Sequence, residues 1–161
     1  MSLAILPGSY DPMTLGHFEL VKHALERYDE AVVAVMVNSA KHTLFDMETR
    51  VEIAKRTVAG LTHVRVISDT GMLVDLFERL HADAVCKGWR TQEDYEYEMR
   101  MAEWNRAHDP RFQTVLIRSE EAYAQISSTR VRECLARGET LDGLVHPNAL
   151  PLVLGKYHEQ I

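Results

Sequence analysis

The chain has few of the residues that mark several common ligand sites. Only two of its 161 residues are cysteine, Cys86 and Cys134, and no CxxC pair or Cys/His ligand spacing occurs. A structural zinc site therefore has little support. Both cysteines lie in apolar stretches, so we expect them to be buried and reduced. None of the eight glycines stands two residues from another, and no G-x-x-x-x-G-K-S/T segment is present, which excludes a standard dinucleotide fingerprint and a P-loop.

Basic residues and long apolar runs are also scarce. The 24 acidic residues outnumber the 18 basic ones and give a formal charge of −6, so the surface as a whole does not suit nucleic acid. Any phosphate binding must be local. The longest apolar run, Ala31 to Val37, is too short to cross a membrane, and the first residues do not form a basic segment followed by a long apolar one. We expect a cytoplasmic protein with neither a nucleic-acid nor a membrane partner.

Apolar segments of strand length alternate with amphipathic segments of helix length along the whole chain. The expected strands are Leu3 to Leu6, Ala31 to Val37, Val64 to Ile67, Ala84 to Cys86 and Thr114 to Ile117. Six helices are expected. The first starts at His17, the fifth follows Ser128 and the last runs from Pro147 to about Tyr157. The other three cover Met47 to Ala59, Met72 to His81 and Gln92 to His108.

This alternation predicts an α/β fold, a Rossmann-like doubly wound sheet of five parallel strands with helices on both faces. A length of 161 residues with 46% hydrophobic content suits one domain spanning residues 1–161. Ligands of such sheets bind beyond the carboxyl ends of strands, where the strand order reverses. Residues 7–17, 38–45, 87–91 and 119–129 each follow an expected strand and are the candidate binding segments.

The first of these segments, Pro7-Gly8-Ser9-Tyr10-Asp11-Pro12-Met13-Thr14-Leu15-Gly16-His17, joins a strand to a helix. The first N–H groups of a helix lack intrahelical partners and the helix dipole is positive there, so anions bind readily. Gly8 and Gly16 allow the backbone to approach a ligand closely. Thr14 and His17 are three positions apart and can face the same ligand. The alternative is a tight turn with a surface histidine.

A second segment, Ile126-Ser127-Ser128-Thr129-Arg130-Val131-Arg132, follows the last expected strand and opens a helix. A helix cap needs only one hydroxyl, whereas three are present. With the surrounding backbone N–H groups, and with Arg130 or Arg132 nearby, they suit a second phosphate site. Serine-rich helix starts are common, so this segment carries weight only together with the first.

Together the two segments resemble the paired signatures of the nucleotidyltransferase superfamily related to the class I aminoacyl-tRNA synthetases. The segments Lys87-Gly88-Trp89-Arg90, Asp94-Tyr95-Glu96-Tyr97-Glu98-Met99 and Met101-Ala102-x-x-Asn105 narrow this resemblance. They are similar to those of the phosphopantetheine adenylyltransferase family of bacterial coenzyme A biosynthesis. Asn38-x-x-Lys41 and Gly71-Met72-Leu73-Val74-Asp75 stand in the expected order, so the resemblance covers nearly the whole chain.

The resemblance implies that ATP and 4′-phosphopantetheine give 3′-dephospho-coenzyme A and pyrophosphate. An anionic phosphate oxygen attacks the α-phosphorus of ATP in line, so positioning and charge stabilisation matter more than a general base. Mg²⁺ is expected with ATP, held mainly by phosphates and water. A homohexamer and feedback inhibition by coenzyme A are further implications of the same kinship.

The resemblance also assigns roles to residues. His17 is the expected transition-state stabiliser at the α-phosphate, and Lys41 is the second expected catalytic residue. The expected ATP-binding residues are Ser9, Tyr10, His17, Gly88, Trp89, Arg90, Glu98, Tyr123, Ala124, Gln125, Ile126, Ser127, Ser128 and Thr129. The expected phosphopantetheine-binding residues are Ser9, Lys41, Leu73 and Lys87.

Several of these residues have a plainer alternative. Lys41 and Lys87 could be solvated surface charges, and Lys87 stands where the family often has arginine, which changes the geometry of phosphate binding. Trp89 replaces a leucine and either lines the adenine pocket or packs over the long helix, with packing favoured. Glu98 could belong to an exposed charge row with Asp94. Two stripes at helical spacing, Met99/Ala102/Arg106 and Tyr97/Met101/Trp104, predict core or subunit contacts.

Two rival functions remain. One is nucleotidyl transfer to another phosphorylated acceptor, such as nicotinamide mononucleotide or glycerol phosphate; relatives with those substrates usually have histidine where Thr14 stands. The other is a nucleotide-sensing module that binds ATP without turnover, for which His17 is not needed.

Overall fold

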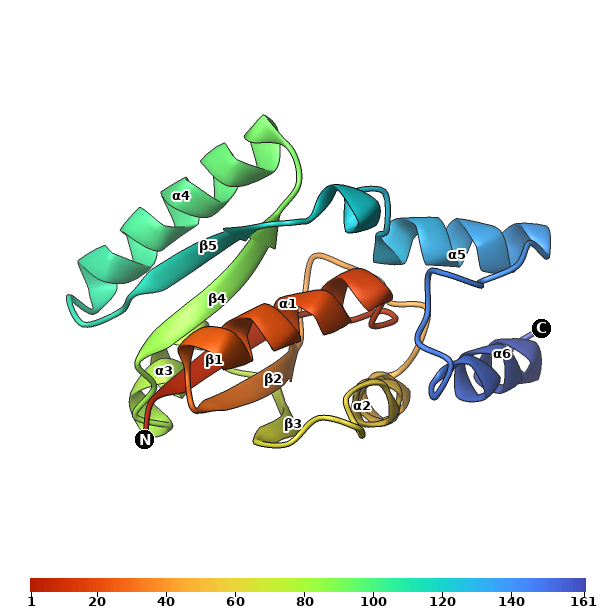
Figure 1. Ribbon diagram of the computed structural model, residues 1–161, viewed down its shortest axis with the longest axis horizontal. Coiled ribbons are helices and arrows are strands. Elements are labelled where there is room, and N and C mark those ends of the chain that lie inside the picture. The colour runs from red at the N-terminus through yellow and green to blue at the C-terminus, as the bar shows by residue number, and fades with distance from the viewer.

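The computed structural model describes all 161 residues and confirms the predicted sheet. Five parallel strands lie in the order β3-β2-β1-β4-β5 (Figure 1). Their bounds are β1 Leu3–Gly8, β2 Glu30–Met36, β3 Val64–Asp69, β4 Ala84–Trp89 and β5 Thr114–Arg118. The chain winds outward from β1 to β3 and then crosses back to β4 on the other side of β1.

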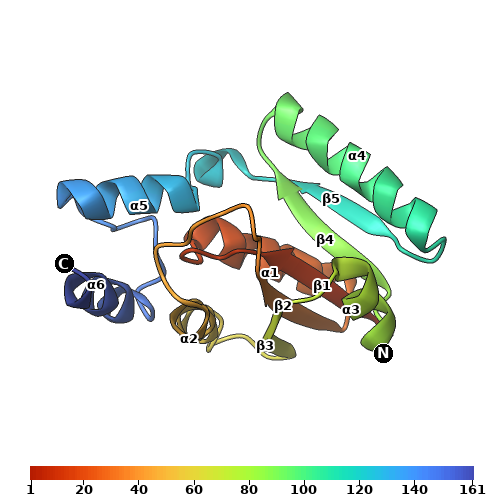
Figure 2. The same cartoon turned by 180° about the vertical axis from the view of Figure 1, so that it is seen from behind.

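Six α-helices and one short 3-10 helix surround the sheet. They are α1 Leu15–Arg27, α2 Met47–Thr57, α3 Leu73–Arg79, α4 Gln92–His108, the 3-10 helix η1 Glu121–Tyr123, α5 Ser128–Arg137 and α6 Leu150–Glu159. Helices α5 and α6 lie together at one end of the molecule, away from the N-terminus, in both views (Figures 1 and 2).

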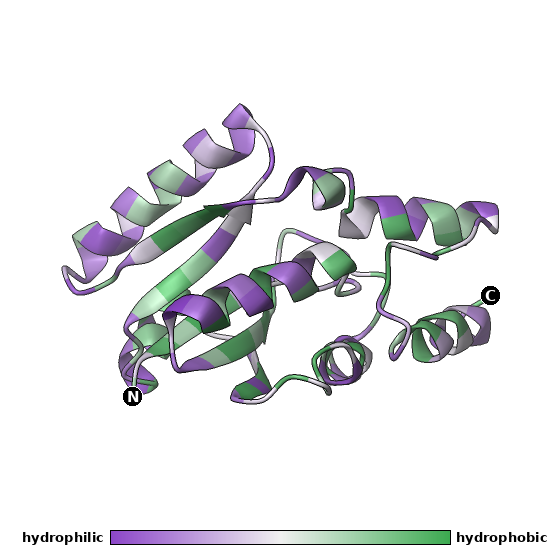
Figure 3. Ribbon diagram, viewed as in Figure 1, coloured by the Kyte–Doolittle hydropathy of each residue, from purple (hydrophilic) through white to green (hydrophobic).

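Alternate residues of the central strand serve two separate apolar cores. Ala4 and Leu6 pack with residues of α1, α2, α5 and α6, whereas Leu3 and Ile5 pack with residues of α3 on the opposite face. A strand that is covered on both faces is apolar throughout instead of alternating, as the burial of β1 and β2 shows. Figure 3 shows this contrast between the hydrophobic strands and the mixed surface of the helices.

The pairing of β1 with its two neighbours places a crevice at the carboxyl edge. With β2, β1 pairs along its whole length, from Leu3 to Gly8. With β4, the pairing stops at Ile5 and Val85, so the last residues of these two strands are free to line a ligand site. The strand order reverses at this point, where doubly wound sheets bind ligands.

Two predicted boundaries are wrong. The fourth strand continues to Trp89, so Lys87 and Gly88 lie within β4 and pair with β5 instead of following the strand. The last helix begins at Leu150 instead of Pro147, because the amides of Ala149 and Leu150 both bond to the carbonyl oxygen of His146 and close a turn there. Pro151 then occupies the first turn of α6. The remaining elements match their predicted positions to within a few residues.

Two further expectations concern the burial of side chains. Cys86 and Cys134 are buried and unpaired, as expected. The two stripes on α4 were expected to make core or subunit contacts. Their large apolar residues are 39–54% exposed, which excludes the core alternative and leaves subunit contacts as a prediction: Tyr97, Met99, Met101 and Trp104. Helix α4 packs only along the edge of the sheet over β4 and β5, which leaves its outer face open.

The central strand predicts a clear stability contrast. Leu6 is fully buried, so Leu6→Ala should reduce the free energy of unfolding by about 2–5 kcal/mol, because it removes buried methyl groups and leaves a cavity. Leu154 on α6 is 36% exposed, and Leu154→Ala should cost much less. Urea unfolding followed by circular dichroism measures both changes. Equal losses would contradict the assignment of β1 to the core.

Candidate active site

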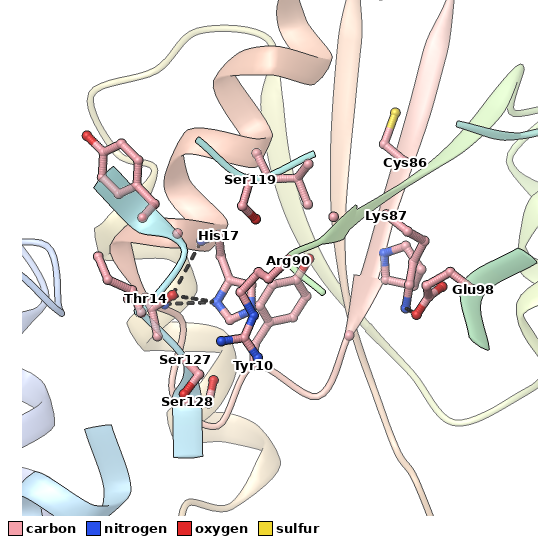
Figure 4. A pocket seen from close by; sticks show the side chains of 17 residues that line it. Tyr10, Thr14, His17, Cys86, Lys87, Arg90, Glu98, Ser119, Ser127 and Ser128 are labelled. Atoms are coloured by element: carbon pink, nitrogen blue, oxygen red, sulfur yellow. Dashed lines mark hydrogen bonds and ion pairs between the residues drawn. The ribbon is translucent and has the colours of Figure 1, made fainter. Parts of the chain in front are cut away.

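A cavity of about 300 Å³ opens between the carboxyl ends of β1 and β4 (Figure 4). Its walls come from the turn after β1, the start of α1, the end of β4, one residue of α4, and the segment from β5 to α5. The lining residues are Pro7, Gly8, Tyr10, Thr14, Gly16, His17, Leu20, Cys86, Lys87, Gly88, Arg90, Glu98, Ser119, Tyr123, Ile126, Ser127 and Ser128.

The start of α1 is fixed by a reciprocal pair of hydrogen bonds between Thr14 and His17. The Thr14 backbone N–H donates to Nδ1 of His17 at 3.0 Å, and the His17 backbone N–H donates to Oγ1 of Thr14 at 3.3 Å. This is a capping box in which histidine takes the place of the usual glutamate or glutamine. The helix cap and the orientation of the candidate catalytic imidazole are thus one structure, drawn as dashed lines in Figure 4.

This capping geometry determines the tautomer of His17. A backbone N–H can only donate, so Nδ1 must accept and carries no proton. In the neutral ring the proton is therefore on Nε2, the nitrogen opposite the cap. His17 lines the cavity, so it offers a hydrogen-bond donor there.

The surroundings of His17 keep its ring neutral. Burial, and then the positive charges of Lys87 and Arg90, lower the pKa of His17 from 6.5 to about 4. The ring of Tyr10 meets the imidazole edge-on, with the centroids 4.9 Å apart. Tyr10 is itself held by a 2.7 Å hydrogen bond from its hydroxyl to the Leu6 carbonyl oxygen. Near pH 7, His17 is a rigid, neutral donor.

The hydroxyl-rich segment meets the first motif directly. Ser127 caps α5 by accepting from the Arg130 N–H at 3.1 Å, and Ser128 Oγ donates to the Pro12 carbonyl oxygen at 2.8 Å. Residues 127 and 128 line the same cavity as Thr14 and His17. The N-termini of α1 and α5 therefore converge on one space, which favours an anion there.

Two cations on the opposite wall add positive charge. Lys87 Nζ lies 3.5 Å from Glu98 Oε1, so Glu98 pairs across to β4 instead of joining an exposed row with Asp94. Arg90 Nη1 donates to the Ala124 carbonyl oxygen at 3.3 Å, which ties the end of β4 to the segment after η1. Although the chain carries a net charge of −6, this cavity gathers two cations against one carboxylate.

An adjoining cavity of about 480 Å³ contains the other expected phosphate ligands. It shares Tyr10, His17 and Ser128 with the first cavity, and it adds Ser9, Asp11, Lys41, His42, Thr43, Thr129 and Arg132. Lys41 is thus brought to the same space as His17, from a loop after a different strand.

A third, smaller pocket of about 110 Å³ extends the site on the α4 side of the sheet. It shares Lys87 and Glu98 with the main cavity and continues along Leu73, Val85, Tyr97, Met101, Ala102, Asn105 and Thr114. Lys87 and Glu98 therefore lie between the polar cavity at His17, which is large enough for phosphate groups, and this narrower, more apolar pocket.

Three of the expected ATP-binding residues do not line these cavities. The ring of Trp89 packs against Tyr95 of α4, with the centroids 5.0 Å apart, and under the Arg118 guanidinium, which supports the packing alternative. Ala124 and Gln125 turn their carbonyl oxygens to Arg90 and Arg130. These two residues shape the covering segment through their backbone.

No sequence motif assigned a role to two buried charged residues of the site. Asp11 and Arg50 are each 5% exposed and bond to the turn and loops around the cavities. Asp11 stands in the first motif, so its position as an acidic residue within a glycine-rich turn could have indicated a role in the site. Arg50 lies on α2, and nothing in its local sequence points to the site.

The donor set does not form a metal cage. The sole carboxylate lining the main cavity is Glu98, which is paired with Lys87. Both oxygens of Asp11 already accept hydrogen bonds. A magnesium ion that enters with ATP fits this site only as part of the substrate, with phosphate and water oxygens as its ligands.

No helix of the chain is both long and apolar enough to cross a membrane.

The chain belongs to the cytidylyltransferase-like class, because that family profile matches residues 5–134, a range that includes the strand-order reversal and the starts of α1 and α5. Curated phosphopantetheine adenylyltransferases are 36% identical in Clostridium botulinum (90% of this chain, 91% of the relative) and 35% identical in Heliobacterium modesticaldum (100% and 96%). The chain belongs to the phosphopantetheine adenylyltransferase family, which confirms the resemblance seen in the sequence.

Solved structures share the fold at lower identity. A Vibrio parahaemolyticus protein, described as a candidate nicotinate-nucleotide adenylyltransferase, superposes with a TM-score of 0.74 at 18% identity and covers 98% of this chain and 94% of its own. A lipopolysaccharide core biosynthesis protein of Thermoplasma volcanium gives 0.55 at 21% identity, over 74% of this chain and 97% of its own. These likenesses describe the fold alone.

The state of His17 can be measured directly. Nitrogen-15 NMR should show the neutral ring with its proton on Nε2 and a titration near pH 4 instead of 6.5. Because the unfolded chain takes up this proton at the higher pH, stability should fall as the pH drops from about 6.5 toward 4. A proton on Nδ1, or an ordinary titration near 6.5, would contradict the capping geometry.

Proposed function

We propose that the cavity between β1 and β4 binds ATP and transfers its adenylyl group to 4′-phosphopantetheine, releasing pyrophosphate and 3′-dephospho-coenzyme A. The observation that carries this proposal is the convergence of the α1 and α5 N-termini on a neutral histidine with Nε2 protonated. This arrangement suits a triphosphate whose α-phosphorus lies at His17.

In this mechanism His17 donates a hydrogen bond from Nε2 to a non-bridging oxygen of the α-phosphate. Charge on that oxygen grows as the acceptor attacks in line, so the bond strengthens in the transition state and speeds the chemical step. The acceptor phosphate is already anionic, so no side chain needs to remove a proton. Thr14 prevents the imidazole from turning, which preserves the geometry at no cost during the reaction.

The leaving pyrophosphate requires its own stabilisation. We assign this to Arg90, to the Thr129 hydroxyl, and to the free N–H groups at the start of α5, which Ser128 holds in place through its own hydroxyl bond to the Pro12 carbonyl oxygen. Magnesium bound to the ATP phosphates would supply further positive charge. Gly88 and residues 123–127 would enclose the nucleoside, with Glu98 at the boundary toward the second substrate.

The acceptor is assigned to the other side of His17. Lys41 and Ser9 line the adjoining cavity together with His17, so they can hold the acceptor phosphate against the α-phosphorus. Lys87 stands at the mouth of the narrow pocket that contains Leu73. The pantetheine arm, which is long, flexible and amide-bearing, fits a narrow pocket with apolar walls and Asn105.

Several broader expectations belong to this proposal. The open apolar face of α4, with Tyr97, Met101 and Trp104, supports assembly of the expected homohexamer, which sedimentation would measure. Coenzyme A carries the same pantetheine arm and would compete for the Leu73 pocket as a feedback inhibitor. A single domain and a cytoplasmic location suit such an enzyme.

The direct experiment mixes the protein with Mg-ATP and 4′-phosphopantetheine and follows pyrophosphate release. We expect release with this acceptor and none with nicotinamide mononucleotide or glycerol phosphate. Release only with one of those acceptors would overturn the substrate assignment, and ATP binding without turnover with any acceptor would indicate a sensing module.

His17→Ala should lower kcat by about 10²–10³-fold, the usual cost of losing one transition-state hydrogen-bond donor, with little change in the dissociation constant of ATP. Steady-state kinetics and calorimetry measure the two quantities. His158→Ala, at a histidine on α6 outside the cavities, is the control and should leave kcat unchanged. An unchanged kcat for His17→Ala would remove His17 from its role.

A further inference from the structure

Two buried charged side chains connect the turn after β1 to the loop after β2, and neither takes part in the chemistry above. Asp11 belongs to the turn, and its carboxylate forms a fork onto two successive amides of the loop. Oδ2 accepts from the Leu44 N–H at 2.8 Å, and Oδ1 accepts from the Phe45 N–H at 2.9 Å. Phe45 is fully buried, so the loop end is anchored in the core as well as to Asp11.

Arg50 of α2 repeats the connection from the other side. Its Nη1 donates to the Ser9 carbonyl oxygen at 2.8 Å, and its Nε donates to the Phe45 carbonyl oxygen at 3.1 Å. Ser9 and Asp11 lie in one turn, and Leu44 and Phe45 lie at one loop end. The same two segments are therefore joined by two direct hydrogen bonds to Asp11 and by one bridge of two hydrogen bonds through Arg50. Each bond involves a buried charged group, and such bonds are stronger than neutral ones.

A third segment is fixed at the same place. Nη1 of Arg132 on α5 donates to the Asp11 carbonyl oxygen at 2.8 Å, and its Nη2 donates to Thr129 Oγ1 at 3.1 Å. Asp11 is thus where the first motif, the loop after β2 and the hydroxyl-rich helix start come together.

Lys41 depends on this anchor for its position. It lies three residues before Leu44, and three residues of fully extended chain span at most about 11 Å. The other bonds near it are local ones to Asn38, from the backbone N–H groups of Ala40 and Lys41. Lys41 is exposed on this loop, so its reach toward His17 is limited by the fixed amides of Leu44 and Phe45.

We propose that Asp11 and Arg50 are positioning residues that hold Lys41 against the acceptor phosphate, acting through the amides and carbonyl groups of the loop end instead of touching substrate. This inference rests on the proposed function, because it takes Lys41 as the acceptor's ligand. It predicts that a change at Asp11 or Arg50 affects the phosphopantetheine side of the reaction and not ATP binding.

The test is a double-mutant cycle with Lys41→Ala. Asp11→Asn keeps the size of the side chain but presents an N–H group to one of the two loop amides. It should lower kcat/KM for 4′-phosphopantetheine by about 10–100-fold, the scale of a small misplacement, with the ATP dissociation constant unchanged. In the Lys41→Ala background the same change should have much less effect, because the group it positions is absent. Arg50→Lys, which keeps the charge but loses the fork, should behave in the same way.

Asp46→Ala is the matched control. Asp46 follows Phe45 directly but caps α2 through the Thr49 N–H, so its loss destabilises the chain without releasing the loop end, and kcat/KM should stay unchanged. Effects of Asp11→Asn and Lys41→Ala that simply multiply would overturn the positioning role. A Lys41→Ala enzyme with normal phosphopantetheine kinetics would instead refute the assignment of Lys41 itself.

Hydrogen exchange on the unaltered protein provides a test that does not depend on activity or on folding of the variants. The Leu44 and Phe45 amides should exchange more slowly than those of His42 and Thr43. Equal exchange rates across residues 42–45 would show that the loop end is not anchored and would overturn the inference.

Discussion

The hydrogen bond from the Thr14 backbone amide to Nδ1 of His17 is the interaction on which the candidate chemistry depends. This contact of 3.0 Å assigns the imidazole proton to Nε2 and orients that nitrogen, and with the reciprocal bond from the His17 N–H to Thr14 Oγ1 it caps helix α1. Burial and the neighbouring cations then keep the ring uncharged. A neutral donor stabilises the extra charge that develops on the phosphate in the transition state. Because it carries no full positive charge, it binds the ground-state phosphate less strongly, so its contribution falls mainly in the transition state.

The sheet brings the other components to that imidazole. Parallel strands share one carboxyl edge, so the segments after β1, β2, β4 and β5 all arrive there, and the reversal of strand order leaves a crevice between β1 and β4. The charge distribution follows the same geometry. The chain is acidic overall, yet Lys41, Lys87 and Arg90 lie around the two cavities near His17, so attraction for phosphate is concentrated where we propose that ATP and 4′-phosphopantetheine meet.

Much of this arrangement was predictable. Apolar runs of three to seven residues between amphipathic segments predicted five parallel strands, because this signal is local. The glycines and hydroxyls of the two motifs predicted an anion site, and both motifs line one cavity. The predictions failed where distant groups decide the outcome. Pairing with β5 extends β4 through Trp89, and a turn closed on His146 delays the last helix. For the stripes of α4 only the core alternative is excluded, because only the edge of the sheet lies beneath this helix and its outer face is exposed in the single chain.

The sequence by itself determined the alternation of elements, the capping residues and the family, since each is written in neighbouring residues or in ordered motifs. Only the tertiary structure decided which groups meet. Ser128 donates a hydrogen bond to the carbonyl oxygen of Pro12, which is 116 positions away in the sequence. Arg50 on α2 donates to the carbonyl oxygens of Ser9 and Phe45. A hydrogen bond between distant residues depends on the path of the whole chain, because its partners are adjacent only after the sheet has brought their strands to one edge.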